Sequence, residues 1–141
     1  VWSITTIDLG DPDDIHPLDK QPIGERLALA VRAHVYGQDL VWSGPHYDGK
    51  GFEHEDGKAL VGFDHLGGGL QARGELKAFE VRDATGLWHE AHAEIAGNRV
   101  AVWHEEIEDP SAVRFGMVDN PETGLFNREG LPAKPFTTVS E

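Results

Sequence analysis

The pattern of hydrophobic positions changes once along the chain, near residue 40. Before that point, a β-branched and aromatic run from Val1 to Leu9 predicts a strand. Apolar residues then recur at helical spacing, which predicts an amphipathic helix with Asp19 as its N-cap, Pro22 in its first turn and Gly37 as its left-handed end. The apolar stripe of this helix consists of Ile23, Leu27, Ala30, Val31 and Val35. The first part of the chain therefore predicts a strand, a loop and a covering helix.

After residue 40, short alternating segments are separated by glycine turns, as is typical of antiparallel strands. Residues 51–55 and 58–64 predict a hairpin around Asp56-Gly57, and Gly97-Asn98 predicts another tight turn. Further strands are expected at residues 78–82, 87–95, 99–104 and 112–118. A β-sandwich is the simplest architecture for this pattern, followed by an irregular strap from residue 119 to residue 139.

These patterns predict two units, residues 1–40 and residues 41–141. The strand at Val1 needs neighbouring strands to pair with, and none precedes it. We therefore expect residues 1–40 to be the last strand, loop and helix of an α/β domain whose earlier part lies upstream. The expected fold class is this α/β fragment followed by an antiparallel β-sandwich, mainly β overall.

The composition and net charge of the chain exclude several classes of binding partner and site. The 141 residues include 12 Lys and Arg against 25 Asp and Glu, giving a formal net charge of -13 without a basic stripe. Neither nucleic acid nor an anionic membrane surface is therefore an expected partner. The absence of cysteine excludes disulfides, thiolate metal sites and a cysteine nucleophile. No apolar run is long enough to cross a bilayer.

The candidate chemistry lies in the loop before the helix. His16 follows a predicted strand, at the rim where open α/β sheets place their reacting groups. A nearby carboxylate would orient its imidazole, as in Ser-His-Asp hydrolases. If the segment forms a turn, Asp13 shares a side with His16, whereas in an extended segment Asp14 does. Pro17 favours an extended conformation at His16, and both acids remain candidates. The alternative without catalysis is a polar loop that only caps the helix.

A serine nucleophile would complete the triad. None of the serines lies in a Gly-Asp-Ser or Gly-x-Ser-x-Gly setting. They are Ser3, Ser43, Ser111 and Ser140. We therefore expect half of a triad here, with its serine on upstream polypeptide.

Several blocks distributed over nearly the whole chain resemble one known family. The first, from residue 8 to residue 21, reads DLGDPDDIHPLDKQ, and the last, from residue 125 to residue 133, reads LFNREGLPA. Between them lie residues 24–29, 36–37, 43–45, 63–70 and 119–121. Together these blocks resemble the C-terminal portion of the sialate O-acetylesterase family, a carbohydrate-esterase branch of the SGNH, or GDSL, hydrolases.

The resemblance implies an enzyme that removes acetyl groups from an acetylated carbohydrate without a metal or cofactor. It implies a serine in a Gly-Asp-Ser block upstream, and a secreted or periplasmic location. In this family pattern His16 corresponds to the general base and Asp13 to the acid of Asp-x-x-His. The family often has asparagine at the position of Asp13 and an acid at that of Asp14, so Asp14 is the alternative acid.

Three further residues are candidates for contact with a sugar. Trp42 and Tyr47 follow the helix, and His65 precedes three glycines that allow close approach of the backbone. Aromatic residues more often pack in cores, and this is the competing interpretation. The main alternative function is a non-catalytic carbohydrate-binding β-sandwich module, with the first segment serving only for docking.

Two other features favour structural roles. Residues 87–95 include several histidines and glutamates, but on one strand Glu90, His92 and Glu94 would form a solvated face rather than a metal site. Trp103 alternates with Ala101 and is predicted to lie in the core.

Overall fold

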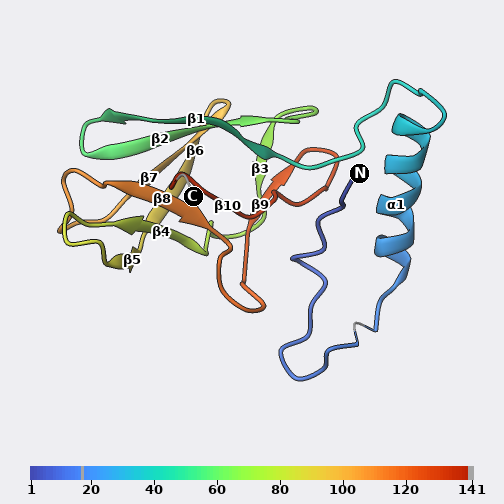
Figure 1. Cartoon of the computed structure of the whole chain (residues 1–141), viewed down its shortest axis with the longest axis horizontal. Helices are drawn as coiled ribbons and strands as arrows, with labels where there is room; N and C mark the ends of the chain where they lie inside the picture. Colours follow the sequence, from blue (N-terminus) through green and yellow to red (C-terminus); the bar gives the residue numbers. More distant parts are fainter. Residues whose placement is uncertain (17, 140–141) are drawn as a thin grey trace.

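The computed structural model describes residues 1–16 and 18–139 and is mainly β, with one helix beside a set of antiparallel strands (Figure 1). The helix is α1 (Gln21–His34). The strands are β1 (His46–Glu55), β2 (Lys58–Asp64), β3 (Leu70–Ala72), β4 (Phe79–Arg82), β5 (Trp88–Glu90), β6 (His92–Ala96), β7 (Arg99–Trp103), β8 (Ala112–Phe115), β9 (Leu125–Asn127) and β10 (Phe136–Thr137). This confirms the predicted fold class of a mostly antiparallel β chain.

Two four-stranded sheets pack face to face to form the core. Their strand orders are β1-β2-β7-β6 and β10-β8-β4-β5, and a small third sheet pairs β3 with β9. In β2, β4, β7 and β8, alternate residues belong to the core. The fully buried members of the core include Val61, Val81, Val100, Val102, Val113, Phe79, Phe115 and Leu125. The Asp56-Gly57 hairpin between β1 and β2 is confirmed, and both turn residues have positive φ, as a two-residue hairpin turn requires.

Helix α1 forms where its periodicity predicts. Pro22 lies in the first turn and Gly37 has φ +65°, as expected, but the N-cap residue is Lys20 rather than Asp19. Asp19 instead accepts a hydrogen bond of 3.3 Å from the backbone N–H of Gln21. Arg26 and Ala30 are the buried residues of the helix. Much of the predicted apolar stripe faces solvent, with relative exposures of 50% for Leu27, 42% for Val31 and 59% for Val35.

The strand predicted from Val1 to Leu9 is wrong for this chain, because within the described residues that segment has no neighbouring strand to hydrogen-bond with. A buried arginine holds the segment instead. Arg26 Nη1 and Nη2 donate to Asp8 Oδ1 and Oδ2, each at 2.7 Å, and Nη1 also donates to the Thr5 carbonyl at 2.8 Å. This bidentate pair fixes residues 5–8 against α1.

Two strand predictions need correction. The strand expected at 87–95 is interrupted at Ala91, whose N–H donates to the Phe79 carbonyl at 2.9 Å. Its halves, β5 and β6, belong to different sheets, so Glu90 does not share a strand with His92. Trp103 is not in the core: it lies half-buried on the outer face of β7, with Lys58 Nζ 4.1 Å from its ring centroid.

The C-terminal strap is more ordered than its composition predicts. It contains β9 and β10, which pair with β3 and β8, respectively. Asn127 of β9 is completely buried. Its Nδ2 donates to the Ser43 carbonyl at 3.0 Å, and its Oδ1 accepts from the N–H of Leu131 at 2.9 Å. This side chain therefore ties the strap to the segment between α1 and β1.

Candidate functional site

The loop from Asp11 to His16 is folded by short-range hydrogen bonds from carboxylates. Asp11 Oδ1 accepts from the N–H of Asp13 at 2.9 Å, and Asp14 Oδ1 accepts from the N–H of His16 at 2.8 Å. Aspartate favours such turns because its short side chain reaches the backbone two residues further on. The loop is thus a pair of successive turns that presents His16 immediately before α1.

Of the two candidate acids, Asp14 lies against the His16 ring. Its Oδ1 is 3.3 Å from His16 Nδ1, whereas Asp13 takes part in the turn through its backbone N–H. A proton on Nδ1 directed at Asp14 leaves the Nε2 lone pair free to accept another proton. Both side chains are open to solvent, with relative exposures of 78% for His16 and 48% for Asp14. The imidazole is thus oriented by a carboxylate and keeps an accessible face.

The surroundings of the loop are open and partly apolar. A depression of about 240 Å³ borders it, lined in part by Leu9, Asp14 and Ile23. Ile15 and Leu18, on either side of His16, are almost fully exposed. Large apolar side chains around a polar group are typical of a surface that another polypeptide or a ligand covers.

The three candidate sugar contacts lie beyond the other end of α1. The ring centroids of Trp42 and His65 are 5.6 Å apart in an edge contact. Tyr47 stacks on Phe136 at 4.9 Å, and its hydroxyl accepts from the N–H of Gly51 at 2.7 Å, so it packs against the core. A helix of 14 residues is about 21 Å long, and this length separates the beginning of α1, near His16, from the end that Trp42 follows.

The structure also contains a serine–histidine contact that sequence reasoning missed. Ser43 Oγ lies 2.7 Å from His46 Nε2. The spacing Ser43-x-x-His46 was the available signal, but the surrounding residues lack a nucleophile motif. Ser43 is only 9% exposed, and the cavity beside it is about 10 Å³, roughly the smallest space that can hold one water. An acetyl ester has no access to this hydroxyl, so the contact is structural.

Burial determines the charge of His46. Desolvation lowers its pKa from 6.5 to about 4, because an imidazolium would lose its hydration there. His65 and Lys134 add to the lowering by charge repulsion, and Asp64 opposes it. His46 is therefore neutral near pH 7.

Neither a metal centre nor a membrane span is evident in the part of the chain that the structure describes. No group of three or more His, Asp or Glu side chains there is arranged to hold a metal ion. Its helix α1 is not long and apolar enough to cross a bilayer.

Comparison with known proteins relates the chain to a solved structure. No family model matches the chain, and no curated protein does. Among solved structures, the chain is similar to a novel carbohydrate acetylesterase from Xanthomonas citri, with 42% sequence identity and a TM-score of 0.86 over 95% of this chain. The chain spans 31% of the length of that protein. The chain is thus related to a carbohydrate esterase. This agrees, at that level, with the resemblance seen in the sequence blocks.

Proposed function

We propose that this chain is the C-terminal part of a carbohydrate O-acetylesterase of the sialate type, within the SGNH hydrolases, and that it supplies two members of a Ser-His-Asp triad. The observation that carries the proposal is the similarity over 95% of the chain to a carbohydrate acetylesterase at 42% identity. The His16 loop adds the chemistry, because it is an exposed imidazole beside a carboxylate. No metal or cofactor is needed for this reaction.

In this mechanism His16 moves one proton twice. Its Nε2 takes the proton of a serine hydroxyl while the serine oxygen bonds to the acetyl carbonyl carbon. When the tetrahedral intermediate collapses, the bond to the sugar oxygen breaks, and His16 returns the proton to that oxygen. Water then releases acetate from the acetyl-serine in the same way. Asp14, at 3.3 Å from Nδ1, stabilises the imidazolium in both steps, and Asp13 is the alternative acid.

The serine belongs to polypeptide other than this chain, upstream of it in the same enzyme. Trp2, Leu27 and Val35 support this, since each is at least half exposed on the unit that carries His16. Such an apolar surface is unusual for a free monomer and fits a covered interface. We propose that the serine-bearing part covers the exposed face of α1 and pairs with residues 1–9.

The substrate is an acetylated carbohydrate. Trp42, Tyr47 and His65 can contact it only if the sugar chain extends along α1, because the helix separates these residues from His16. The partly exposed rings of Trp42 and His65 suit such a contact better than Tyr47, which is stacked on Phe136.

The test uses enzyme that contains both this chain and the serine-bearing part. His16→Ala should lower kcat for acetyl-ester hydrolysis by about 10²–10⁴-fold with unchanged thermal stability, because its work is proton transfer. His54→Ala is the matched control, since His54 makes a similar exposed contact of 3.2 Å with Asp109. Asp14→Asn and Asp13→Asn then identify the acid, whose loss lowers kcat with little change in KM.

Two results would overturn the proposal. One is a His16→Ala enzyme that retains the kcat of the His54→Ala control. The other is turnover of an aryl acetate by the purified 141-residue chain, together with labelling of this polypeptide by a serine-directed phosphonate. We expect the chain alone to be inactive and unlabelled.

A further inference from the structure

A groove crosses the sandwich where the chain passes from β5 to β6. Two cavities of about 330 Å³ and about 310 Å³ adjoin there and share Glu90 and His92. Each is at the lower end of the size range of small-ligand sites, and the two shared residues place them side by side. The groove exists because the segment crosses between the two sheets at Ala91 instead of continuing as one strand. Figure 1 shows β5 and α1 on opposite sides of the molecule.

One wall of the groove is aromatic. Trp103 of β7 lines the first cavity and pairs in register with His92 of β6. The two ring centroids are 5.6 Å apart, with planes inclined by 35°. Lys58 Nζ, 4.1 Å from the centroid of Trp103, covers part of the indole. The C–H groups of a pyranose ring pack well on such a surface, because indole offers a large apolar area.

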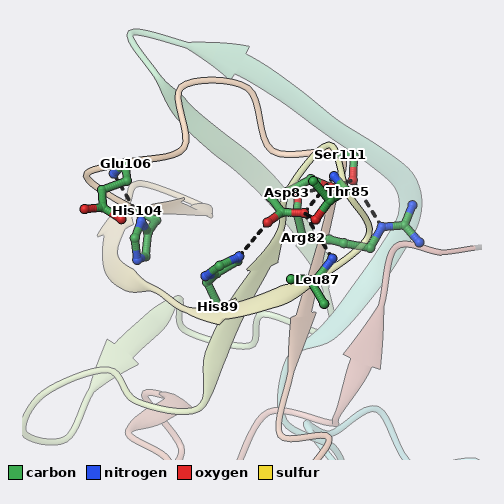
Figure 2. Close-up of polar contacts among 8 residues, drawn as sticks. All are labelled: Arg82, Asp83, Thr85, Leu87, His89, His104, Glu106 and Ser111. Atoms are coloured by element: carbon green, nitrogen blue, oxygen red, sulfur yellow. Dashed lines mark hydrogen bonds and ion pairs between the residues drawn. The ribbon is translucent and has the colours of Figure 1, made fainter.

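Polar contacts shown in Figure 2 order the turn between β4 and β5, which leads to Glu90. Asp83 Oδ1 accepts from the N–H and hydroxyl of Thr85 at 2.8 and 2.6 Å and from the N–H of Leu87 at 3.0 Å. Asp83 Oδ2 lies 2.7 Å from His89 Nε2, which fixes β5 directly before Glu90. The hydrogen bonds of Thr85, followed by that of His89, hold the pKa of Asp83 well below its usual range, so it stays ionised.

The second cavity has an equally ordered edge. His104 Nδ1 accepts from the N–H of Glu106 at 3.1 Å, which closes the turn after β7. The centroid of the His104 ring lies 5.5 Å from that of His89, so the turn after β7 lies against β5. An ordered turn loses little conformational entropy when a ligand binds beside it.

The charged side chains that line the groove determine whether a neutral or an acidic sugar can bind there. The carboxylates that line it are those of Glu75, Glu90, Glu105 and Glu106. Two cations lie at this surface, and each is paired: Lys77 with Glu122 at 2.7 Å, and Lys58 with Glu94 at 2.6 Å. Carboxylates accept hydrogen bonds from sugar hydroxyls but repel sialate and uronate groups. The groove therefore suits an uncharged sugar chain.

We propose that this groove binds a neutral oligosaccharide, which stacks on Trp103 and donates hydroxyl hydrogen bonds to Glu90 and its neighbours. This site goes beyond the proposed esterase function, since it lies apart from His16 and needs no serine. It would hold a polymeric substrate on the sandwich while the acetyl group is removed elsewhere.

Isothermal titration of the 141-residue chain with cellohexaose, xylohexaose and mannohexaose tests the proposal, with hexagalacturonate as the acidic probe. We expect at least one neutral hexasaccharide to bind and the acidic one not to bind. Trp103→Ala should weaken binding by about tenfold or more, because a central tryptophan is a typical binding hot spot. Trp88→Phe is the control, since Trp88 lies outside both cavities, with Arg114 stacked 4.4 Å from its ring centroid.

If the Trp103→Ala variant unfolds, Glu90→Gln is the second test variant. Glu90 is exposed, so its replacement leaves the core intact. It should weaken binding of the neutral chain and leave the thermal midpoint unchanged. The proposal fails if no neutral hexasaccharide binds, if hexagalacturonate binds equally well, or if folded variants bind like the parent chain. None of these outcomes bears on the esterase proposal, whose test is turnover by the assembled enzyme.

Discussion

Acidification is expected to destabilise the fold through His46, at the start of β1. An unfolded chain protonates a histidine near pH 6.5, whereas folded His46 does so only near pH 4. Between these values unfolding takes up a proton, so the free energy of unfolding falls as the pH falls. Above pH 6.5 both states are neutral and the contribution of His46 is fully present. Below pH 4 both are protonated and the loss is complete.

The size of this effect follows from the two pKa values. Each pH unit in the window costs about 1.4 kcal/mol, so the ceiling is about 3 kcal/mol. The imidazole is only partly buried, and solvent screening reduces the penalty. We therefore expect the free energy of unfolding to fall by about 1–2 kcal/mol on account of His46.

Urea denaturation at a series of pH values from about 7.5 to about 4, for the parent chain and His46→Gln, measures this effect. Glutamine can still hydrogen-bond to Ser43 Oγ but does not titrate, so the loss due to His46 is the pH-dependent part of the difference between the two proteins. His54→Gln is the control, because His54 lies on the surface. If the difference between parent and His46→Gln stays constant over this range, the desolvation argument is refuted.

Two substitutions test how the chain is held together. Arg26→Ala leaves the Asp8 carboxylate and the Thr5 carbonyl without their partner, so residues 1–9 should detach at a local cost of about 3 kcal/mol. Limited proteolysis should then cut near the N-terminus faster than in the exposed control Arg32→Ala, and equal rates would contradict the clamp. Gly44→Ala places a Cβ 2.6 Å from the Leu131 carbonyl oxygen, which should lower the free energy of unfolding by about 1–3 kcal/mol in urea titrations. Gly24→Ala, with free space around it, should raise that free energy by about 0.5–1 kcal/mol, and equal effects at both glycines would refute the packing argument.

Elements with local determinants were predictable from the sequence. The hairpin at Asp56-Gly57 depends on two residues that tolerate positive φ, and both stand at the turn. Helix α1 depends on a 3.6-residue period and on Pro22 in its first turn. In each case the residues that decide the conformation lie within a few positions of one another.

Elements that depend on distant partners were not predictable in the same way. Residues 1–9 have strand composition, but a strand forms only beside another one. Hydrophobic and polar residues alternate from Leu87 to Ile95 in the same way whether the segment lies in one sheet or in two. The periodicity therefore could not predict the crossing at Ala91. Trp103 went to the outer face because Val100 and Val102 occupy the inward positions of β7.

The candidate site shows the same division. The spacing in the sequence predicted an acid near His16 but did not decide between Asp13 and Asp14. The turn geometry brings the Asp14 carboxylate next to His16 Nδ1. The Ser43–His46 contact depends on how the strap packs on Gly44, which no local pattern records. The groove joins β5, β6 and the turn after β7, and only the fold brings these together.

The two candidate surfaces of this chain differ in what they need from other polypeptide. The His16 loop is exposed and flanked by apolar side chains, and its proposed chemistry requires an activated serine, whereas no serine of this chain lies in a nucleophile motif. The proposed groove is lined by residues of the sandwich alone, and its carboxylates all come from this chain. Binding of a neutral sugar should therefore survive in the isolated chain, whereas turnover should appear only on assembly. The two proposals therefore separate experimentally, because sugar binding is tested on the 141-residue chain and turnover on the assembled enzyme.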